Sequence, residues 1–134
     1  MAVLLDTNVL SDVLTGDPRW SAWSREQLER HRSGGLVVNS VIYAELSIPA
    51  RDLDEVDAVL LEFGLELREI PRPGLFSAGK AFARYRGKGG KKTSPLPDFF
   101  IGGHAEASSL LLITRNAARY RTYFPTLVLV APDS

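Results

Sequence analysis

Short apolar runs alternate along this chain with longer segments in which apolar residues recur at helical spacing. This alternation is typical of parallel strands joined by crossover helices, because each strand must return to the same end of the sheet before the next begins. The apolar runs predict strands at 2–5, 36–39, 65–70, 110–114 and 127–130. The intervening segments predict helices at 7–14, 18–31, 41–48, 53–63, 74–85 and 98–107. We therefore expect an α/β fold with a central, mainly parallel five-stranded sheet.

The chain has 134 residues, the usual size of one domain, and we expect residues 1–134 to form a single domain. It has no Cys, which excludes disulfides, thiolate zinc sites and thiol nucleophiles. The first apolar run is too short for a signal-peptide core, and far shorter than the roughly 20 residues that span a bilayer. These features predict a cytoplasmic protein with no membrane contact, in which any metal would have oxygen or imidazole ligands.

Basic and acidic residues are equal in number but unequally distributed. Sixteen of each give a formal net charge of zero, yet no acidic residue lies between Ile70 and Asp98. A basic stripe of this kind is either a solvated helix face or a contact surface for the phosphates of a nucleic acid. The candidate RNA-binding residues in and after this stretch are Arg84, Arg86, Lys88, Lys91, Lys92 and Arg115.

Polar residues gather where two predicted strands end. Asp6 directly follows the first strand, segment 114–116 follows the fourth, and Asp98 begins the helix before the fourth. Ligands of open parallel sheets bind outside the carboxyl ends of the strands, so these groups are candidates for one site. Asp6 and Asp98 also stand where a carboxylate serves as a helix N-cap, which is the simpler explanation of either residue alone.

Glu45 is harder to explain as a surface residue. Its neighbours about one turn away on the predicted helix are apolar, namely Val41, Ile42 and Ile48. A carboxylate on such a face needs a cation, a hydrogen-bond network or a raised pKa, because burying it ionised and unpaired is costly. Three carboxylates without Cys or nearby His form a hard oxygen site that suits Mg²⁺ or Mn²⁺. Such sites typically serve phosphoryl chemistry.

Four segments, taken in order, resemble the motifs of PIN-domain ribonucleases, and most closely those of the VapC-type toxins of toxin–antitoxin pairs. They are 3–10 (VLLDTNVL), 40–46 (SVIYAEL), 97–105 (PDFFIGGHA) and 112–116 (LITRN). Each motif is short, but the ordered set is fairly specific, and the resemblance covers essentially the whole chain.

The resemblance implies one PIN-like domain, an α/β/α sandwich, that acts as a metal-dependent endoribonuclease and as the toxin of a toxin–antitoxin pair. It implies Asp6, Glu45, Asp98 and Asn116 as catalytic residues, with the three acids as ligands of Mg²⁺ or Mn²⁺. A fourth acid usually stands at the position of Asn116. The amide still offers an oxygen but cannot act as a base, which puts a second metal in doubt. The implied partners are RNA, a cognate antitoxin and a second copy in a homodimer.

The alternative is a catalytically weak PIN-like module that binds RNA or a protein. Asn116 favours it, whereas the retention of three acids argues against it, because a binding module has little reason to keep charges that repel phosphate. Trp20 and Trp23 share a helix face that is either core or part of an antitoxin groove. We expect His104 to be a packed residue without a catalytic role. Under the resemblance, Thr7, Asn8 and Thr114 either position groups of the site or serve as turn and cap residues.

Overall fold

The computed structural model describes residues 1–90 and 96–132 and contains a five-stranded sheet. The strand order is β3-β2-β1-β4-β5, and every neighbouring pair is parallel. The strands are β1 (Val3–Leu5), β2 (Leu36–Val38), β3 (Leu65–Leu67), β4 (Leu111–Ile113) and β5 (Leu129–Val130). The predicted α/β fold with a five-stranded parallel sheet is therefore confirmed.

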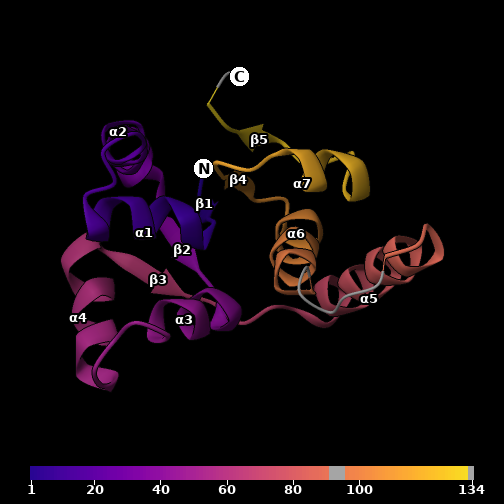
Figure 1. Cartoon of the computed structure of the whole chain (residues 1–134), viewed down its shortest axis with the longest axis horizontal. Coiled ribbons are helices and arrows are strands. Elements are labelled where there is room, and N and C mark those ends of the chain that lie inside the picture. The colour runs from indigo at the N-terminus through magenta and orange to yellow at the C-terminus, as the bar shows by residue number, and fades with distance from the viewer. Residues whose placement is uncertain (91–95, 133–134) are drawn as a thin grey trace.

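Seven α-helices surround this sheet in the described residues. They are α1 (Thr7–Thr15), α2 (Ser21–His31), α3 (Ser40–Ser47), α4 (Leu53–Phe63), α5 (Arg72–Gly87), α6 (Leu96–Ser108) and α7 (Ala118–Tyr123), and a short 3-10 turn, η1 (Arg32–Gly34), follows α2. In Figure 1, α1, α2 and α4 lie to the left of β1 and β4, and α5, α6 and α7 lie to their right. This is the arrangement that right-handed crossovers produce when the winding reverses at β1. Within the described residues, no helix is both long enough and apolar enough to cross a bilayer.

Several predicted boundaries were wrong, and most errors are at the ends of strands and helices. The predicted strand 65–70 ends at Leu67, since only residues 65–67 pair with β2. The predicted helix 18–31 begins at Ser21, because the Asp17 carboxylate accepts hydrogen bonds from the backbone N–H groups of Arg19 and Trp20 and holds a turn there. Helix α7 was not predicted. Helix α6 begins two residues earlier than predicted and keeps Pro97 in its first turn, where proline is tolerated.

The core lies where both faces of the central strands are covered. All residues of β1 and β2 are buried, as are Ile42, Phe99 and Ile101 of the covering helices. In α4, Leu53 is exposed, whereas Val56 one turn later is buried in the core. His104 is buried, and its Nδ1 lies 3.0 Å from Nδ2 of the buried Asn39. Its expected role as a packed residue agrees with this burial.

Candidate functional site

Asp6 lies at the carboxyl end of β1, in the position before α1 where an N-cap is expected. Its side chain nevertheless makes no capping hydrogen bond to the helix. The Oδ2 atom accepts hydrogen bonds from the Thr114 hydroxyl at 2.7 Å and from the Tyr120 hydroxyl at 3.0 Å. The Asn8 amide lies 3.4 Å from the same oxygen. The carboxylate is therefore held by polar groups from α1, from the end of β4 and from α7.

The environment of Asp6 disfavours its negative charge. The side chain is only 5% exposed, and burial raises its pKa from 3.8 to about 6. The hydrogen bond from Thr114 lowers the pKa, the charge of Asp98 raises it, and the bond from Tyr120 lowers it again. Burial also raises the pKa of the Tyr120 hydroxyl, together with the charges of Asp6, Asp98 and Glu45. A bound cation would relieve this accumulation of negative charge.

Glu45 projects from the middle of α3 toward α1. Its Oε1 accepts a hydrogen bond of 2.6 Å from the hydroxyl of Thr7, the first residue of α1. Glu45 is only half-buried, and it lies beside a cleft of about 460 Å³ whose lining includes Val41, Pro97 and Phe100. A carboxylate on an apolar helix face was expected to need a partner, and for Glu45 this partner is the hydroxyl of Thr7. Thr7 directly follows Asp6 in the sequence.

Asp98 lies in the first turn of α6 and not at an N-cap, because the helix begins at Leu96. Its Oδ2 accepts a hydrogen bond and ion pair of 2.7 Å from Nη1 of Arg119 in α7. Both side chains are about a third exposed or more, at 35% for Asp98 and 41% for Arg119. The carboxylate is accessible, and its present partner is a side chain of the same molecule.

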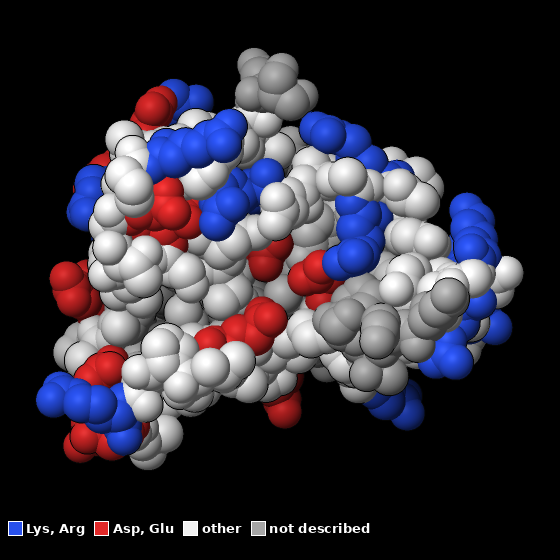
Figure 2. Space-filling model, viewed as in Figure 1, with Lys and Arg blue, Asp and Glu red and all other residues white. Residues whose placement is uncertain are grey.

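The three predicted carboxylates lie around Tyr120, because the charges of Asp6, Asp98 and Glu45 all raise the pKa of its hydroxyl. The space-filling view in Figure 2 shows acidic residues around a hollow near the middle of this face, with basic residues along its upper rim. Among residues 1–90 and 96–132, no three acidic or His residues lie close enough together to hold a metal ion as they stand. The donor set of Asp6, Glu45 and Asp98 fits Mg²⁺ or Mn²⁺ by its chemistry, since all its atoms are hard oxygens.

Asn116 is exposed and lies at the mouth of the same region. It lines a cleft of about 530 Å³ together with Asp98, Arg119 and Arg121. Its backbone N–H donates to the Thr114 hydroxyl oxygen at 3.1 Å, so Thr114 connects Asn116 with Asp6. The position that carries a fourth acid in the resembled family is therefore next to the other site residues here.

The predicted RNA-binding residues do not share one environment. Arg84 donates to the carbonyl oxygen of Tyr123 at 3.0 Å, and Arg86 and Lys88 lie over the rings of Phe82 and Tyr123. Lys91 and Lys92 lie outside the described residues. The Arg115 side chain is directed inward, where it forms an ion pair with Asp12 of α1 at 2.7 Å.

Two residues whose long-range contacts lie in or beside the site were missed by the sequence analysis. Tyr120 lies in α7, a helix that was not predicted, and its hydroxyl reaches Asp6 from 114 residues away in sequence. Asp12 follows Asn8 by one helical turn, and its pairing with Arg115 spans 103 residues. For Asp12, the sequence offered one signal. It stands four residues after Asn8 in α1 and therefore on the same face of the helix.

Trp20 and Trp23 have different surroundings. Trp23 is half-buried and packs against the core. Trp20 lies beside two guanidinium groups, with Arg19 4.8 Å and Arg115 5.6 Å from its ring centroid. Trp20 is thus part of the ion-paired surface around Arg115.

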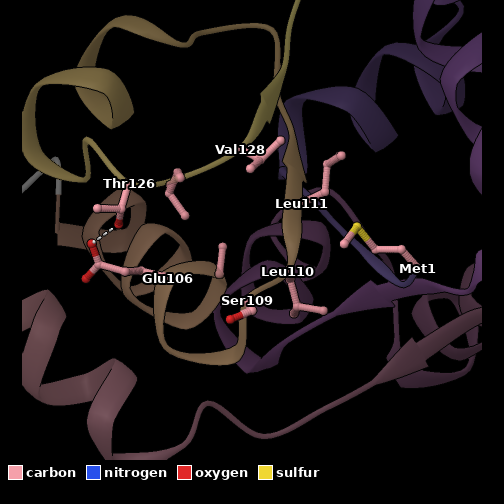
Figure 3. Close-up of a pocket in the computed structure, with 9 residues that line it drawn as sticks. Met1, Glu106, Ser109, Leu110, Leu111, Thr126 and Val128 are labelled. Atoms are coloured by element: carbon pink, nitrogen blue, oxygen red, sulfur yellow. Dashed lines mark hydrogen bonds between the residues drawn. The ribbon is translucent and has the colours of Figure 1, made fainter.

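A separate, mostly apolar cleft of about 370 Å³ lies at the amino end of β4. Figure 3 shows Met1, Leu111 and Val128 on its walls. Its acid, Glu106, accepts hydrogen bonds from the hydroxyls of Thr126 and Ser77. The cleft lies at the opposite end of the strand from Thr114 and takes no part in the candidate site.

Comparisons with known proteins agree with this architecture. The PIN domain family matches residues 3–125 of the chain. No curated protein matches the sequence. VapBC2 from Rickettsia felis, solved bound to a DNA fragment from its promoter, is 22% identical, with a TM-score of 0.75 over 99% of this chain and 100% of that one. DNA-bound VapBC from Salmonella typhimurium is 21% identical, with a TM-score of 0.73 over 98% of both chains. FitAcB from Neisseria gonorrhoeae is 18% identical, with a TM-score of 0.69 over 96% of both. At these identities the structural likeness establishes a shared fold.

Proposed function

We propose that this chain, which belongs to the PIN domain family, is a metal-dependent endoribonuclease that acts as the toxin of a toxin–antitoxin pair. The observation that carries the proposal is the state of Asp6. This carboxylate is buried at the carboxyl end of a central strand, its pKa is raised to about 6, and the charge of Asp98 contributes to that shift. Structural acids are normally paired with a cation, whereas Asp6 has neutral hydrogen-bond donors and feels the charge of another acid.

Asp6 and Asp98 are the proposed ligands of Mg²⁺ or Mn²⁺, and Glu45 is a third ligand or orients the attacking water. The metal would supply a bound water of lowered pKa and would offset the charge that develops on the scissile phosphate. Thr114 and Tyr120 hold Asp6 by hydrogen bonds to Oδ2. Thr7 holds Glu45 in the same way. These hydroxyls keep the carboxylates oriented while the protein is metal-free.

The RNA would follow the basic end of α5 toward the acidic hollow. Arg84, Arg86 and Lys88 lie in the last turn of this helix and at its end. Lys91 and Lys92 follow in the sequence and extend the same basic stretch. Phosphate contacts of this kind are sequence-independent and weaken as salt concentration rises. RNA affinity that does not change with salt would contradict this part of the proposal.

The proposed partners are a cognate antitoxin and a second copy of the chain. The solved structures of similar fold include a toxin–antitoxin complex from Klebsiella pneumoniae and VapBC-1 from nontypeable Haemophilus influenzae. We expect the isolated chain to be a homodimer, which light scattering on the eluting peak of a size-exclusion column measures directly.

Cleavage of RNA by the purified protein tests the proposal. A mixed pool of structured and single-stranded RNAs is incubated with Mg²⁺, with Mn²⁺ and with chelator, beside the Asp98→Asn variant. We expect cutting that requires the metal and is lost in the variant. This substitution changes the volume of the side chain little and removes its charge. Circular dichroism of the variant shows whether the fold is retained.

Asn116 favours one alternative, a weak module that binds RNA without cutting it. The residue is exposed beside the acidic site and lacks the charge that a fourth acid would supply. Under this alternative the wild type binds RNA but does not cleave it, whether Mg²⁺ or Mn²⁺ is present. The Asn116→Asp variant then gains metal-dependent cleavage. Cleavage by the wild type rejects the alternative.

A further inference from the structure

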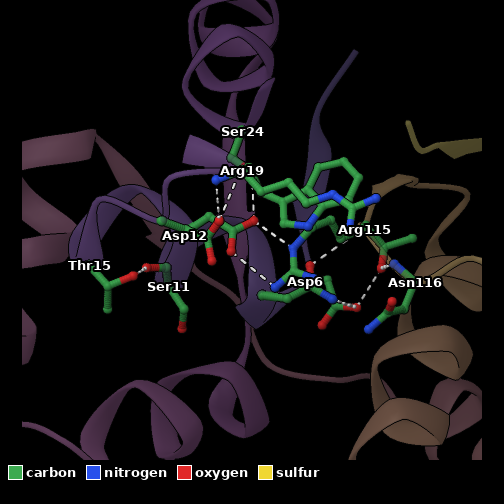
Figure 4. Close-up of polar contacts among 12 residues, drawn as sticks. Asp6, Ser11, Asp12, Thr15, Arg19, Ser24, Arg115 and Asn116 are labelled. Carbon is green, nitrogen blue, oxygen red and sulfur yellow. Dashed lines mark hydrogen bonds and ion pairs between the residues drawn. The ribbon is translucent and has the colours of Figure 1, made fainter. Parts of the chain in front are cut away.

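Asp12 is a buried carboxylate of α1 that none of the proposed roles uses. Its side chain is 3% exposed, and both of its oxygens accept hydrogen bonds from one guanidinium group. Nε of Arg115 lies 2.7 Å from Oδ2, and Nη2 lies 3.0 Å from Oδ1. The Ser24 hydroxyl of α2 donates to Oδ2 at 3.0 Å. Figure 4 shows Ser24, Asp12 and Arg115 converging, with Asp6 and Asn116 beside them. The Asp12–Arg115 pair thus connects two helices with the segment that follows β4.

This segment reaches the candidate site through two hydrogen bonds. The backbone N–H of Arg115 donates to Oδ1 of Asn8 at 3.2 Å, and the Asn8 amide lies 3.4 Å from Oδ2 of Asp6. Thr114, which directly precedes Arg115, donates its hydroxyl to the same oxygen of Asp6. A displacement of Arg115 would therefore disturb two of the groups that hold the Asp6 carboxylate.

We propose that Asp12 is a positioning residue, which holds Arg115 by both guanidinium nitrogens and thereby fixes Thr114 and Asn8 around Asp6. This inference rests on the proposed function, because the geometry it protects is that of the nuclease site. A bidentate pair is directional as well as strong, so it sets the orientation of the segment and not only its distance from α1.

The same contacts argue against Arg115 as an RNA-binding residue. Its side chain is only 24% exposed, and the Asp12 carboxylate neutralises its charge. Its guanidinium group also lies 5.6 Å from the centroid of the Trp20 ring, which limits its reach toward solvent. A phosphate-binding arginine needs free donors, and here at least two donors are already used.

Steady-state cleavage by four variants tests the positioning role. They are Asp12→Asn, Arg115→Gln, Arg115→Lys and the double variant Asp12→Asn/Arg115→Gln. We expect each single change to lower kcat by about 10- to 100-fold, as is usual for groups that orient a metal ligand. KM should stay within about twofold, because no RNA contact is lost. The double variant should be no worse than the poorer single variant, since both changes break the same pair.

Arg115→Lys separates the two roles of this residue. Lysine keeps the positive charge but cannot reproduce the two parallel bonds to Asp12, so a positioning role predicts a loss of kcat. A phosphate contact predicts that lysine is tolerated and that Arg115→Gln raises KM. This second pattern, together with normal cleavage by Asp12→Asn, would overturn the inference. Arg25→Gln, which removes an exposed arginine of α2, is the matched control.

Amide hydrogen exchange tests the same positioning without RNA or metal. The amides of Arg115 and Asn116 should exchange at least about tenfold faster in Asp12→Asn and in Arg115→Lys, because the segment opens locally. The amides of Val3 and Leu112, which donate to the carbonyl oxygens of Gly35 and Val128 just before β2 and β5, should be unchanged. Unchanged exchange at Arg115 and Asn116 would overturn the inference. The two proposals can fail separately. If exchange is faster in the variants but the wild-type protein cuts no RNA, the positioning role is supported and the proposed function is rejected.

Discussion

At the scale of single residues, the surroundings of Asp6 disfavour the ionised form of its side chain. The carboxylate is buried, its hydrogen-bond donors are neutral, and the charge of another acid, Asp98, acts on it. These neutral donors offset only part of the cost of burial, which is why the pKa is raised to about 6. Under the proposed function this arrangement would suit a bound cation, and without one it should reduce the stability of the fold.

Asp6→Asn should stabilise the metal-free protein near neutral pH. In the folded state the pKa of Asp6 is about 6, against an ordinary value of 3.8, so the folded state binds the proton more tightly. The stability that this group contributes is fully present below pH 3.8 and is lost as the pH rises through 6. The asparagine lacks this titration, and we expect it to raise the free energy of unfolding by on the order of 2–3 kcal/mol at pH 7.5.

Urea denaturation of both proteins at pH 4 and pH 7.5, with chelator present, measures this difference. The difference in unfolding free energy should be small at pH 4 and large at pH 7.5. A variant that is less stable than the wild type at pH 7.5 would contradict the prediction. Added Mn²⁺ should stabilise the wild type and not Asp6→Asn, because binding to the folded state alone raises stability.

Under the proposed function, Arg119 would compete with the metal for Asp98, since its guanidinium Nη1 lies 2.7 Å from Oδ2 of that acid. Arg119→Gln should therefore raise Mn²⁺ affinity. The gain should be roughly two- to fivefold, because both side chains are partly exposed and pairs of this kind are weak. Isothermal titration calorimetry measures the affinity, with Arg121→Gln as the control for removing a nearby charge. Equal or weaker Mn²⁺ binding by Arg119→Gln would show that the ion pair does not oppose the metal.

At the scale of elements, the contact between α5 and α6 depends on glycine. A Cβ added at Gly103 would clash with the carbonyl oxygen of Gly74 and would lie 3.0 Å from the backbone nitrogen of Ala78. At Gly102, a Cβ would lie 2.5 Å from the Phe124 ring, so this glycine allows the ring to pack against α6. The backbones of these helices approach closely, and this contact fixes the position of α6, whose first turn carries Asp98.

Gly103→Ala should separate α5 from α6. We expect it to lower the free energy of unfolding by about 1–3 kcal/mol, the usual cost of overpacking a well-filled contact. Gly79→Ala in α5 is the matched control, because a Cβ there meets nothing within 4 Å. This control should raise stability by about 0.5–1 kcal/mol, since alanine favours helix more than glycine does. Thermal unfolding followed by circular dichroism measures both, and a Gly103→Ala variant as stable as the wild type would contradict the packing argument.

At the scale of the whole molecule, one core joins the two layers of helices to the sheet. The buried apolar residues form a single cluster that includes strands β1, β2 and β4 and helices from both layers. We propose on this basis that residues 1–134 form one cooperative unit.

Equilibrium unfolding should accordingly be a single transition. Fluorescence of Trp20 and Trp23 reports on the region of α2, whereas far-ultraviolet circular dichroism reports on all helices. The two signals should give the same midpoint in urea within error, as expected for a small single domain. Separate midpoints would show that the layers unfold independently and would reject the single-domain proposal.

The fold was predictable because its signals are local and repeated. Five apolar runs separated by helical segments leave few architectures other than a parallel sheet, so α/β class and strand number were correct. The ends of strands were not predictable, since β3 ends where its pairing with β2 ends and not where its apolar pattern does. Helix α7 is six residues long, too short for a periodic pattern to identify.

The sequence by itself determined which groups stand at the carboxyl ends of β1 and β4, because that order is a property of the chain. Only the tertiary structure decided what those groups do. In the folded protein the Asp6 side chain does not cap α1 but accepts a hydrogen bond from the Tyr120 hydroxyl. The guanidinium group of Arg115 forms an ion pair with the buried Asp12. Both contacts join residues more than a hundred positions apart, and no local propensity specifies a pairing at that distance. Such pairings form when crossover helices bring distant segments to one edge of the sheet, and the chemistry of this site depends on them.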